Sequence, residues 1–169
     1  MRWIWIDRIV ELERGERCVA IKNVSLAEEH LHDHFAATDA YPATPIMPTP
    51  LMIEGMAQTA GILVGHARDF SEKVILAKIG KARFEDDVTP GQTLRYVATL
   101  DHITDAGAST SGIVERIDHA AADPTPRQIG EVSLTFSHID QNRAGLEFPE
   151  HNFVFTDQFM DLMRNSGVA

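Results

Sequence analysis

One apolar stretch in the middle of the chain constrains the fold more than any other segment. Residues 50–67 read PLMIEGMAQTAGILVGHA and follow directly on Thr49. Thr49 is suited to the N-cap of a helix and Pro50 to its first position. Apolar side chains would lie on every side of this helix, and a helix of that kind is buried on every side. The sequence therefore predicts a central helix that the rest of the chain encloses, with Gly55 and Gly61 among the small residues that let a sheet approach it.

The remainder of the chain supplies strands that could enclose this helix. Residues 3–24 are rich in β-branched and aromatic residues and predict a hairpin. The prolines of residues 25–48 argue against a helix in that connecting segment. After the central helix, turn sequences separate four further predicted strands at residues 74–84, 93–103, 109–118 and 128–139. We therefore expect an α+β fold in which a curved antiparallel sheet wraps around one long helix.

Length and pattern divide the chain into one domain and an extension. The 169 residues suit a single domain, which we assign to residues 1–140. Residues 141–169 form a C-terminal extension in this interpretation. It contains a short predicted amphipathic helix, capped by Thr156, which we expect to pack on the domain or across a dimer. The apolar stripe of this helix comprises Phe159, Met160, Leu162 and Met163.

Charge and composition exclude several classes of function. The formal net charge of −10 argues against a nucleic-acid partner, because phosphate binding needs a basic field. The longest apolar window contains Glu54 and Gln58 and is too short to span a bilayer. The single cysteine, Cys18, cannot form an internal disulfide and fits a reducing compartment. We therefore expect a cytoplasmic protein that neither binds nucleic acid nor crosses a membrane.

Two titratable residues stand out against the apolar background of the central helix. Glu54 is the only charge in its apolar run, and burial favours the protonated form of a carboxyl group, so Glu54 could serve as an acid. Gln58 lies four residues further on the same helix face and could orient it. His34, before the proline-rich segment, could act as a base because imidazole titrates near neutral pH. A purely structural role for Glu54 is the alternative.

The start of the helix adds a third chemical element. Its free N–H groups and its dipole could stabilise negative charge on a carbonyl oxygen. A base, an acid and such a site together suit removal of a proton next to a carbonyl, with departure of a hydroxyl group. The predicted reaction is the dehydration of a 3-hydroxyacyl group.

Several motifs carry a resemblance to a known family. They are DRIVELERGERCVAIKNV, HF, PIMPTPLMIEGMAQ, KARF and TPGQTL, in this order. Through them, roughly residues 6–138 resemble the 3-hydroxyacyl-acyl-carrier-protein dehydratases of fatty-acid synthesis. The resemblance implies the hot-dog fold, in which an antiparallel sheet wraps around a long helix. It also implies an acyl thioester substrate on acyl-carrier protein or CoA, and a homodimer or a trimer of dimers.

The resemblance also implies roles for individual residues. His34 would be the base and Glu54 the acid, contributed by different subunits of a dimer. The N–H group of Thr49 would polarise the thioester carbonyl. The residues that would line the acyl channel are Phe35, Ile46, Met47 and Pro48.

The chain departs from the family pattern in three places. The segment after His34 is longer than usual, and Tyr41 within it could gate or narrow the channel. Asp33 and Thr49 stand where the family has glycine. Acidic residues 85–87 follow the KARF motif, where the family tends to be basic. A local basic patch remains that could still receive a carrier protein, and it comprises Lys78, Lys81 and Arg83. The alternative is that these three residues are only solvated strand charges.

Two other functions are alternatives to dehydration, and one group of histidines is a candidate metal site. The same fold could hydrolyse thioesters with a water held by Glu54. The longer segment and Thr49 would also suit a catalytically inactive acyl-binding or partner subunit. His30, His32 and His34 alternate and would share one face of an extended segment, as a zinc site needs. No cysteine or second cluster supports zinc, so we expect no metal ion, and we expect no cofactor.

Overall fold

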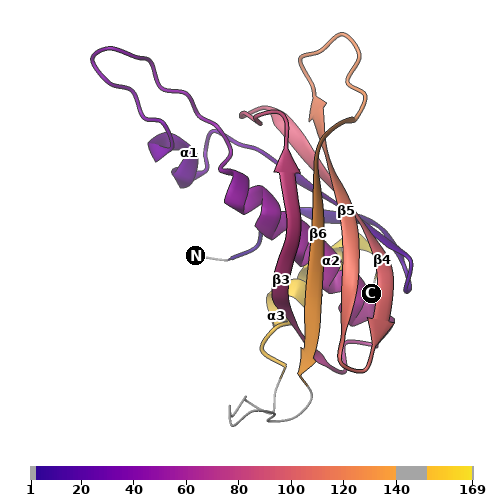
Figure 1. Ribbon diagram of the computed structural model, residues 1–169. Coiled ribbons are helices and arrows are strands. Elements are labelled where there is room, and N and C mark those ends of the chain that lie inside the picture. Colours follow the sequence, from indigo (N-terminus) through magenta and orange to yellow (C-terminus); the bar gives the residue numbers. More distant parts are fainter. Residues whose placement is uncertain (1–2, 140–151, 169) are drawn as a thin grey trace.

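The described part of the chain consists of one sheet and three helices. The computed structural model describes residues 3–139 and 152–168. All the strands lie in one antiparallel sheet, and α2 lies against one face of it (Figure 1). The predicted α+β architecture of one sheet around one long helix is confirmed. The elements are β1 (Arg8–Glu13), β2 (Arg17–Asn23), α1 (Glu29–Asp33), α2 (Thr49–Ala67), β3 (Lys73–Phe84), β4 (Gln92–Thr104), β5 (Gly107–Asp118), β6 (Arg127–Ile139) and α3 (Asp157–Ser166).

The strands do not lie in chain order within the sheet. Their order is β1-β2-β4-β5-β6-β3, and every neighbouring pair is antiparallel. The first strand after α2 is therefore an edge strand, which pairs with β6 from Lys73 opposite Ile139 to Phe84 opposite Gly130. No strand of the described chain pairs with the outer edge of β3. Each of the four strands predicted after the helix lies within an observed strand.

Small residues allow the sheet to approach α2 closely, as predicted. Gly55 lies against the ring of Tyr96 on β4, and a Cβ atom at Gly55 would be 2.5 Å from that ring. Gly112 on β5 is similarly close to Met56, because a Cβ atom there would be 2.6 Å from the sulfur. Tyr96 and Met56 are buried. Packing this dense leaves no room for a larger side chain at either glycine.

α2 is not buried on every side, which corrects the prediction from its apolar pattern. Leu51, Ile53 and Glu54 are half-buried, whereas most residues from Gly55 onward are buried. One sheet covers one side of a helix, so the first turns of α2 stay open on the other. The helix also begins one residue earlier than predicted, with Pro48 as its N-cap. Within the described ranges, no helix is long and apolar enough to cross a membrane.

The connection between β2 and α2 contains a helix that the proline pattern did not predict. The five-residue helix α1 precedes the first proline, Pro42, so the chain is free to form a helical turn there. After α1 the chain forms a loop that projects away from the sheet and from α2 (Figure 1). The loop returns to the body at Met47, which is fully buried and whose N–H group donates to the carbonyl of Val88 at 2.8 Å.

α3 packs against β1, at the opposite edge of the sheet from β3. Its N-cap is Thr156, as predicted, and Gly167 ends it in a left-handed conformation with φ of 74°. Met163 is buried, and Ser166 Oγ accepts a hydrogen bond from the N–H group of Ile9 at 3.0 Å. The predicted domain boundary at residue 140 lies outside the described residues.

The close approach of α2 to β4 generates a stability prediction. We expect Gly55→Ala to lower the free energy of unfolding by about 1–3 kcal/mol, because the added methyl would collide with Tyr96. Gly61→Ala is the matched control in the same helix, since its Cβ atom would meet Phe136 at 3.7 Å, an ordinary contact distance. Alanine also gains up to about 1 kcal/mol of helix propensity over glycine. Urea unfolding measures the stability of both variants. Equal stability of the two would contradict the close packing of Gly55 against Tyr96.

Candidate active site

His34 lies where α1 ends and the projecting loop begins. Its N–H group donates to the carbonyl of His30 at 3.1 Å and closes the last helical turn. Phe35 then adopts a left-handed conformation with φ of 58°, which stops the helix and turns the chain into the loop. The carbonyl of Phe35 accepts a hydrogen bond from the N–H group of Thr44 at 2.9 Å, so the loop is closed at its base. The half-buried imidazole is therefore held on a fixed backbone.

A single hydrogen bond indicates which nitrogen of the neutral His34 ring carries the proton. Nδ1 lies 2.5 Å from the carbonyl oxygen of Ile46. A backbone carbonyl can only accept, so Nδ1 must carry the proton and donate it. In the neutral imidazole the lone pair is then on Nε2, which is the atom that can act as a base. The sequence suggested a base at His34 but gave no sign of Ile46 as its partner.

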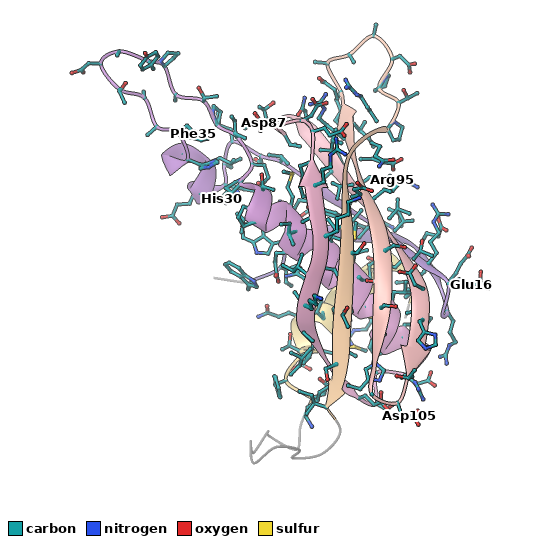
Figure 2. The ribbon with its side chains drawn as sticks, viewed as in Figure 1. Glu16, His30, Phe35, Asp87, Arg95 and Asp105 are labelled. Atoms are coloured by element: carbon teal, nitrogen blue, oxygen red, sulfur yellow. The ribbon has the colours of Figure 1, made fainter. Side chains whose placement is uncertain are left out.

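His30 lies beside this site in surroundings that favour its neutral form. Its ring packs edge-on against Trp5, with centroids 5.1 Å apart. Burial lowers the pKa of His30, which disfavours its charged form. Figure 2 shows His30 and Phe35 at the α1 end of the molecule, at the opposite end from Asp105. A neutral neighbour adds no competing positive charge next to His34.

The carboxyl group of Glu54 is oriented by two donors. The indole Nε1 of Trp3 donates to Glu54 Oε1 at 3.1 Å, and Gln58 Nε2 donates to the same oxygen at 2.9 Å. The second oxygen, Oε2, receives no hydrogen bond from the described residues. The carboxyl group is half-buried, not enclosed as the apolar pattern suggested. One oxygen is thus fixed by two hydrogen bonds, and the described residues leave the other without a donor.

Gln58 joins Glu54 to the N-terminal segment. Its Oε1 accepts a hydrogen bond from the N–H group of Trp5 at 2.8 Å, and its Nε2 donates to the carbonyl of Trp3 at 3.1 Å as well as to Glu54. This pattern of one donor partner and two acceptor partners determines which end of the amide is nitrogen. The two tryptophans were not predicted as site residues, because their alternation is typical of strand packing.

The start of α2 leaves one backbone donor available. The N–H groups of Leu51 and Met52 are bonded to the carbonyl of Pro48, at 2.9 and 3.3 Å. Pro50 has no N–H group. Among the described residues, none accepts a hydrogen bond from the N–H group of Thr49, which is exposed at the positive end of the helix dipole. This group could bind a carbonyl oxygen that gains negative charge.

His34 follows α1, whereas Glu54 lies on α2. No hydrogen bond or ion pair between the two is found among the described residues. Phe35 and Tyr41, predicted channel residues, are 60% and 75% exposed on the projecting loop, which extends away from α2 (Figure 1). Met47 is fully buried in the core. Glu54 thus lies on α2 and His34 at the base of the loop.

The predicted basic patch lies on the edge strand β3. Lys78, Lys81 and Arg83 are all exposed. Lys81 forms an ion pair with Glu131 at 2.5 Å, and Arg83 forms one with Glu85 at 3.1 Å. Two of the three cations are therefore partly neutralised by neighbouring carboxylates.

The three alternating histidines do not form a zinc site. The zinc alternative assumed an extended segment, but His30 and His32 lie within α1 and His34 caps it, so His32 lies on a different face of the helix from His30. His32 Nε2 instead lies 2.7 Å from the carbonyl of Leu26. In the described part of the chain, no group of three or more His, Cys, Asp or Glu residues is arranged to hold a metal ion.

Comparison with known proteins places this site in a family context. A family model described as a FabA-like domain matches residues 3–117. The 3-hydroxyacyl-acyl-carrier-protein dehydratase FabZ of Caldanaerobacter subterraneus is 37% identical over 121 residues, which span 71% of this chain and 82% of the relative. The FabZ dehydratase of Paracidovorax citrulli is 39% identical over 124 residues, with 71% and 80% of the two chains covered.

Solved structures with the same architecture are more distant in sequence. A thioesterase family protein from Silicibacter pomeroyi has a TM-score of 0.58 at 13% identity, covering 78% of this chain and 82% of its own. A conserved protein from Pseudomonas aeruginosa has a TM-score of 0.56 at 16% identity, covering 78% and 87%. Such low identities show the fold alone, and the predicted hot-dog fold is confirmed.

The amide of Gln58 generates a prediction about the N-terminal segment. We expect Gln58→Leu to lower the free energy of unfolding by about 1–3 kcal/mol, because the buried N–H group of Trp5 would lose its acceptor. Trp3→Phe, which removes an exposed side-chain bond to Glu54 and keeps an aromatic ring next to Trp5, should cost less than about 1 kcal/mol. Urea unfolding of both variants compares the two costs. A Gln58→Leu protein as stable as the Trp3→Phe protein would contradict this anchoring role.

Proposed function

The chain belongs to the FabA-like family, and from that membership we propose that it dehydrates 3-hydroxyacyl thioesters to trans-2-enoyl thioesters. Its curated relatives named as 3-hydroxyacyl-acyl-carrier-protein dehydratases share 33–43% identity with it. The acyl group of the substrate would be carried on acyl-carrier protein or on CoA. The observation that supports the residue assignment most directly is the contact between His34 Nδ1 and the Ile46 carbonyl, because it leaves Nε2 as the base.

The proposed reaction moves one proton to His34 and one from Glu54. His34 Nε2 takes a proton from C2 of the 3-hydroxyacyl thioester, and the electron pair of that C–H bond forms the C2–C3 double bond. The C3–O bond breaks, and Glu54 donates its proton to the departing hydroxyl group, which leaves as water. The products are a trans-2-enoyl thioester, an imidazolium and a carboxylate. Before the next turnover the imidazolium releases its proton and the carboxylate takes one up, so the net reaction is the loss of one water.

The surrounding residues position the thioester in this proposal. The N–H group of Thr49 donates to the thioester carbonyl and stabilises the negative charge that develops when C2 loses its proton. Gln58 donates a hydrogen bond to Oε1 of Glu54, which leaves Oε2 of Glu54 to face the hydroxyl group. The loop residues that would contact the acyl thioester are Phe35, Tyr41, Ile46 and Pro48, with the buried Met47 anchoring the end of the loop.

The proposed active site is shared between two chains. His34 lies at the base of the projecting loop and forms no hydrogen bond or ion pair with its own Glu54 among the described residues, and the open first turns of α2 leave Glu54 accessible to a second copy. The edge strand β3 is long and largely exposed, and it presents the apolar side chains of Leu76 and Ile79. Unpaired edges of this kind pair readily with another strand. We propose a homodimer in which His34 of each chain faces Glu54 of the partner subunit.

Carrier-protein docking is proposed at the basic residues of β3. Acyl-carrier proteins are acidic, and Lys78, Lys81 and Arg83 lie together on one exposed strand. The ion pairs of Lys81 and Arg83 with neighbouring carboxylates would have to be exchanged for contacts with the carrier. Such exchange at exposed pairs costs little, because surface ion pairs contribute at most about 1 kcal/mol.

The proposed acid and base predict the behaviour of two single variants. We expect His34→Ala and Glu54→Ala each to slow hydration of trans-2-butenoyl thioesters by roughly 100-fold or more, the usual contribution of a positioned proton-transfer group. The loss of absorbance of the conjugated enoyl thioester measures the rate, with the acyl group on acyl-carrier protein and on CoA. His32→Ala, which removes an exposed imidazole from the same helix, is the matched control and should retain the rate.

Other outcomes of this assay would contradict the proposal. Full activity of both alanine variants would exclude the assigned roles. Release of free thiol without interconversion of enoyl and 3-hydroxyacyl groups would indicate thioester hydrolysis. Absence of any turnover by the wild-type protein would indicate an acyl-binding or partner subunit.

A further inference from the structure

A pocket lies next to Glu54 on the side away from the start of α2. Its volume is about 140 Å³. One wall is the face of α2 that carries Glu54 and Gly61, and the sheet contributes Val74 of β3 and Phe136 of β6. Apart from Glu54 and the amide that binds it, the lining is apolar. A pocket with one carboxyl group at its end and apolar walls beyond suits a molecule with a polar reacting group and an alkyl tail.

The outer wall of this pocket comes from the C-terminal segment. Val154, Phe155 and Phe159 line it, opposite the helix and the sheet. The family model ends at residue 117, so this wall is made by residues outside the family match. The apolar stripe of this segment was predicted to pack on the domain or across a dimer, and the proposed dehydration assigns it no role.

The wall is fixed to the body of the protein at its N-terminal end. Asn152 Nδ2 donates to the carbonyls of Phe70 and Glu72, each at 3.2 Å. Its Oδ1 accepts from the N–H groups of Val154 and Phe155, at 3.1 and 3.2 Å. One side chain thus ties the segment to the chain that leads from α2 to β3.

Aromatic packing fixes the next part of the wall. The ring of Phe155 packs edge-on against Phe70, with centroids 4.9 Å apart. It also rests on the backbone of α2 at Gly65, where a Cβ atom would be 2.3 Å from the ring. The glycine therefore makes room for this ring, and α3 beyond it is held to β1 by Ser166. A wall held at both ends cannot swing away easily to admit a longer molecule.

The pocket continues the line along which the substrate would lie. The proposed thioester carbonyl binds at Thr49 and the hydroxyl group at Glu54, so the acyl chain proceeds toward Gly61 along the axis of α2. Seven residues of helix from Glu54 to Gly61 span about 10 Å. A cavity of about 150 Å³ holds one benzene ring, so a pocket of similar volume takes about six carbons.

We propose that the segment Val154–Phe159, as the outer wall of the acyl pocket, limits the size of the pocket and restricts the enzyme to short and medium 3-hydroxyacyl chains. This inference rests on the proposed dehydratase function and specifies its substrate class. Phe159 is the specificity-determining residue that can be tested best, because it is only half-buried and its removal opens the outer wall. Gly61 is its counterpart on the inner wall, where a larger side chain would fill the pocket.

The test compares the chain-length profile of three variants with the wild type. The probes are trans-2-butenoyl, trans-2-octenoyl and trans-2-hexadecenoyl thioesters of CoA, and kcat/KM for hydration is the measurement. We expect the wild type to hydrate the first two far better than the third. Phe159→Ala should raise the ratio of hexadecenoyl to butenoyl activity by about tenfold or more, since each buried methylene contributes about 0.8 kcal/mol. Gly61→Leu should lower the ratio of octenoyl to butenoyl activity by a similar factor.

Met160→Ala is the matched control for loosening of α3. Met160 lies on the same helix and packs on the core, but it does not line the pocket, so its removal should leave the profile unchanged. An unchanged profile in both Phe159→Ala and Gly61→Leu would overturn the inference while wild-type hydration upholds the proposed function. The same shift in Met160→Ala as in Phe159→Ala would also overturn it. No hydration of any probe by the wild type would instead refute the proposed function itself.

Discussion

The structure depends on how an apolar helix is covered. α2 carries apolar side chains around most of its circumference, and one curved sheet can cover only one side of it. The sheet approaches through Gly55 and Gly112, where no larger side chain would fit. On the uncovered side, the C-terminal segment packs at Gly65, toward the end of the helix. The first turns remain open, and they carry Glu54 and the N–H group of Thr49, for which the described residues provide no acceptor. The incomplete cover of α2 thus leaves its one carboxyl group accessible.

The two proposed catalytic residues are positioned by separate parts of the chain. The carbonyl of Ile46 holds His34 at the base of the projecting loop, and Gln58 together with Trp3 holds Glu54 on the helix. In each residue the hydrogen bonds are made by the atom that does not react, Nδ1 of His34 and Oε1 of Glu54. Nε2 of His34 and Oε2 of Glu54 therefore remain for the substrate. Neither anchor brings the two residues together within one chain. A second copy of the chain is the simplest means to complete the site, and the exposed edge of β3 offers a surface through which it could pair.

Much of the fold could be predicted from the sequence because strands and helices leave distinct periodicities. The four strands after α2 and the long helix itself were found by alternation and by apolar content. The short helix α1 was missed, because prolines later in the same segment dominated the pattern. Burial of α2 on every side was also wrong, since apolar content does not reveal how many elements are available to cover a helix.

The candidate site could be predicted only in part, for reasons of distance along the chain. His34, Glu54 and Gln58 were identified from residue type, apolar context and helical spacing. The partners that orient them were not identified, because Ile46 acts through its backbone carbonyl and Trp3 lies 51 residues from Glu54. The pocket wall at Val154–Phe159 was missed in the same way. Contacts between segments distant in sequence leave no local pattern in a single chain.

The central claim, that two chains share each active site, is tested most directly by mixing the two inactive variants. Co-expression of His34→Ala with Glu54→Ala chains allows mixed dimers to form, and each mixed dimer would contain one site with both residues intact. In a two-fold symmetric dimer with random pairing, about a quarter of all sites would be intact, so hydration should recover to about a quarter of the wild-type rate. A mixture in which mixed dimers are present but no more active than either variant alone would contradict the account.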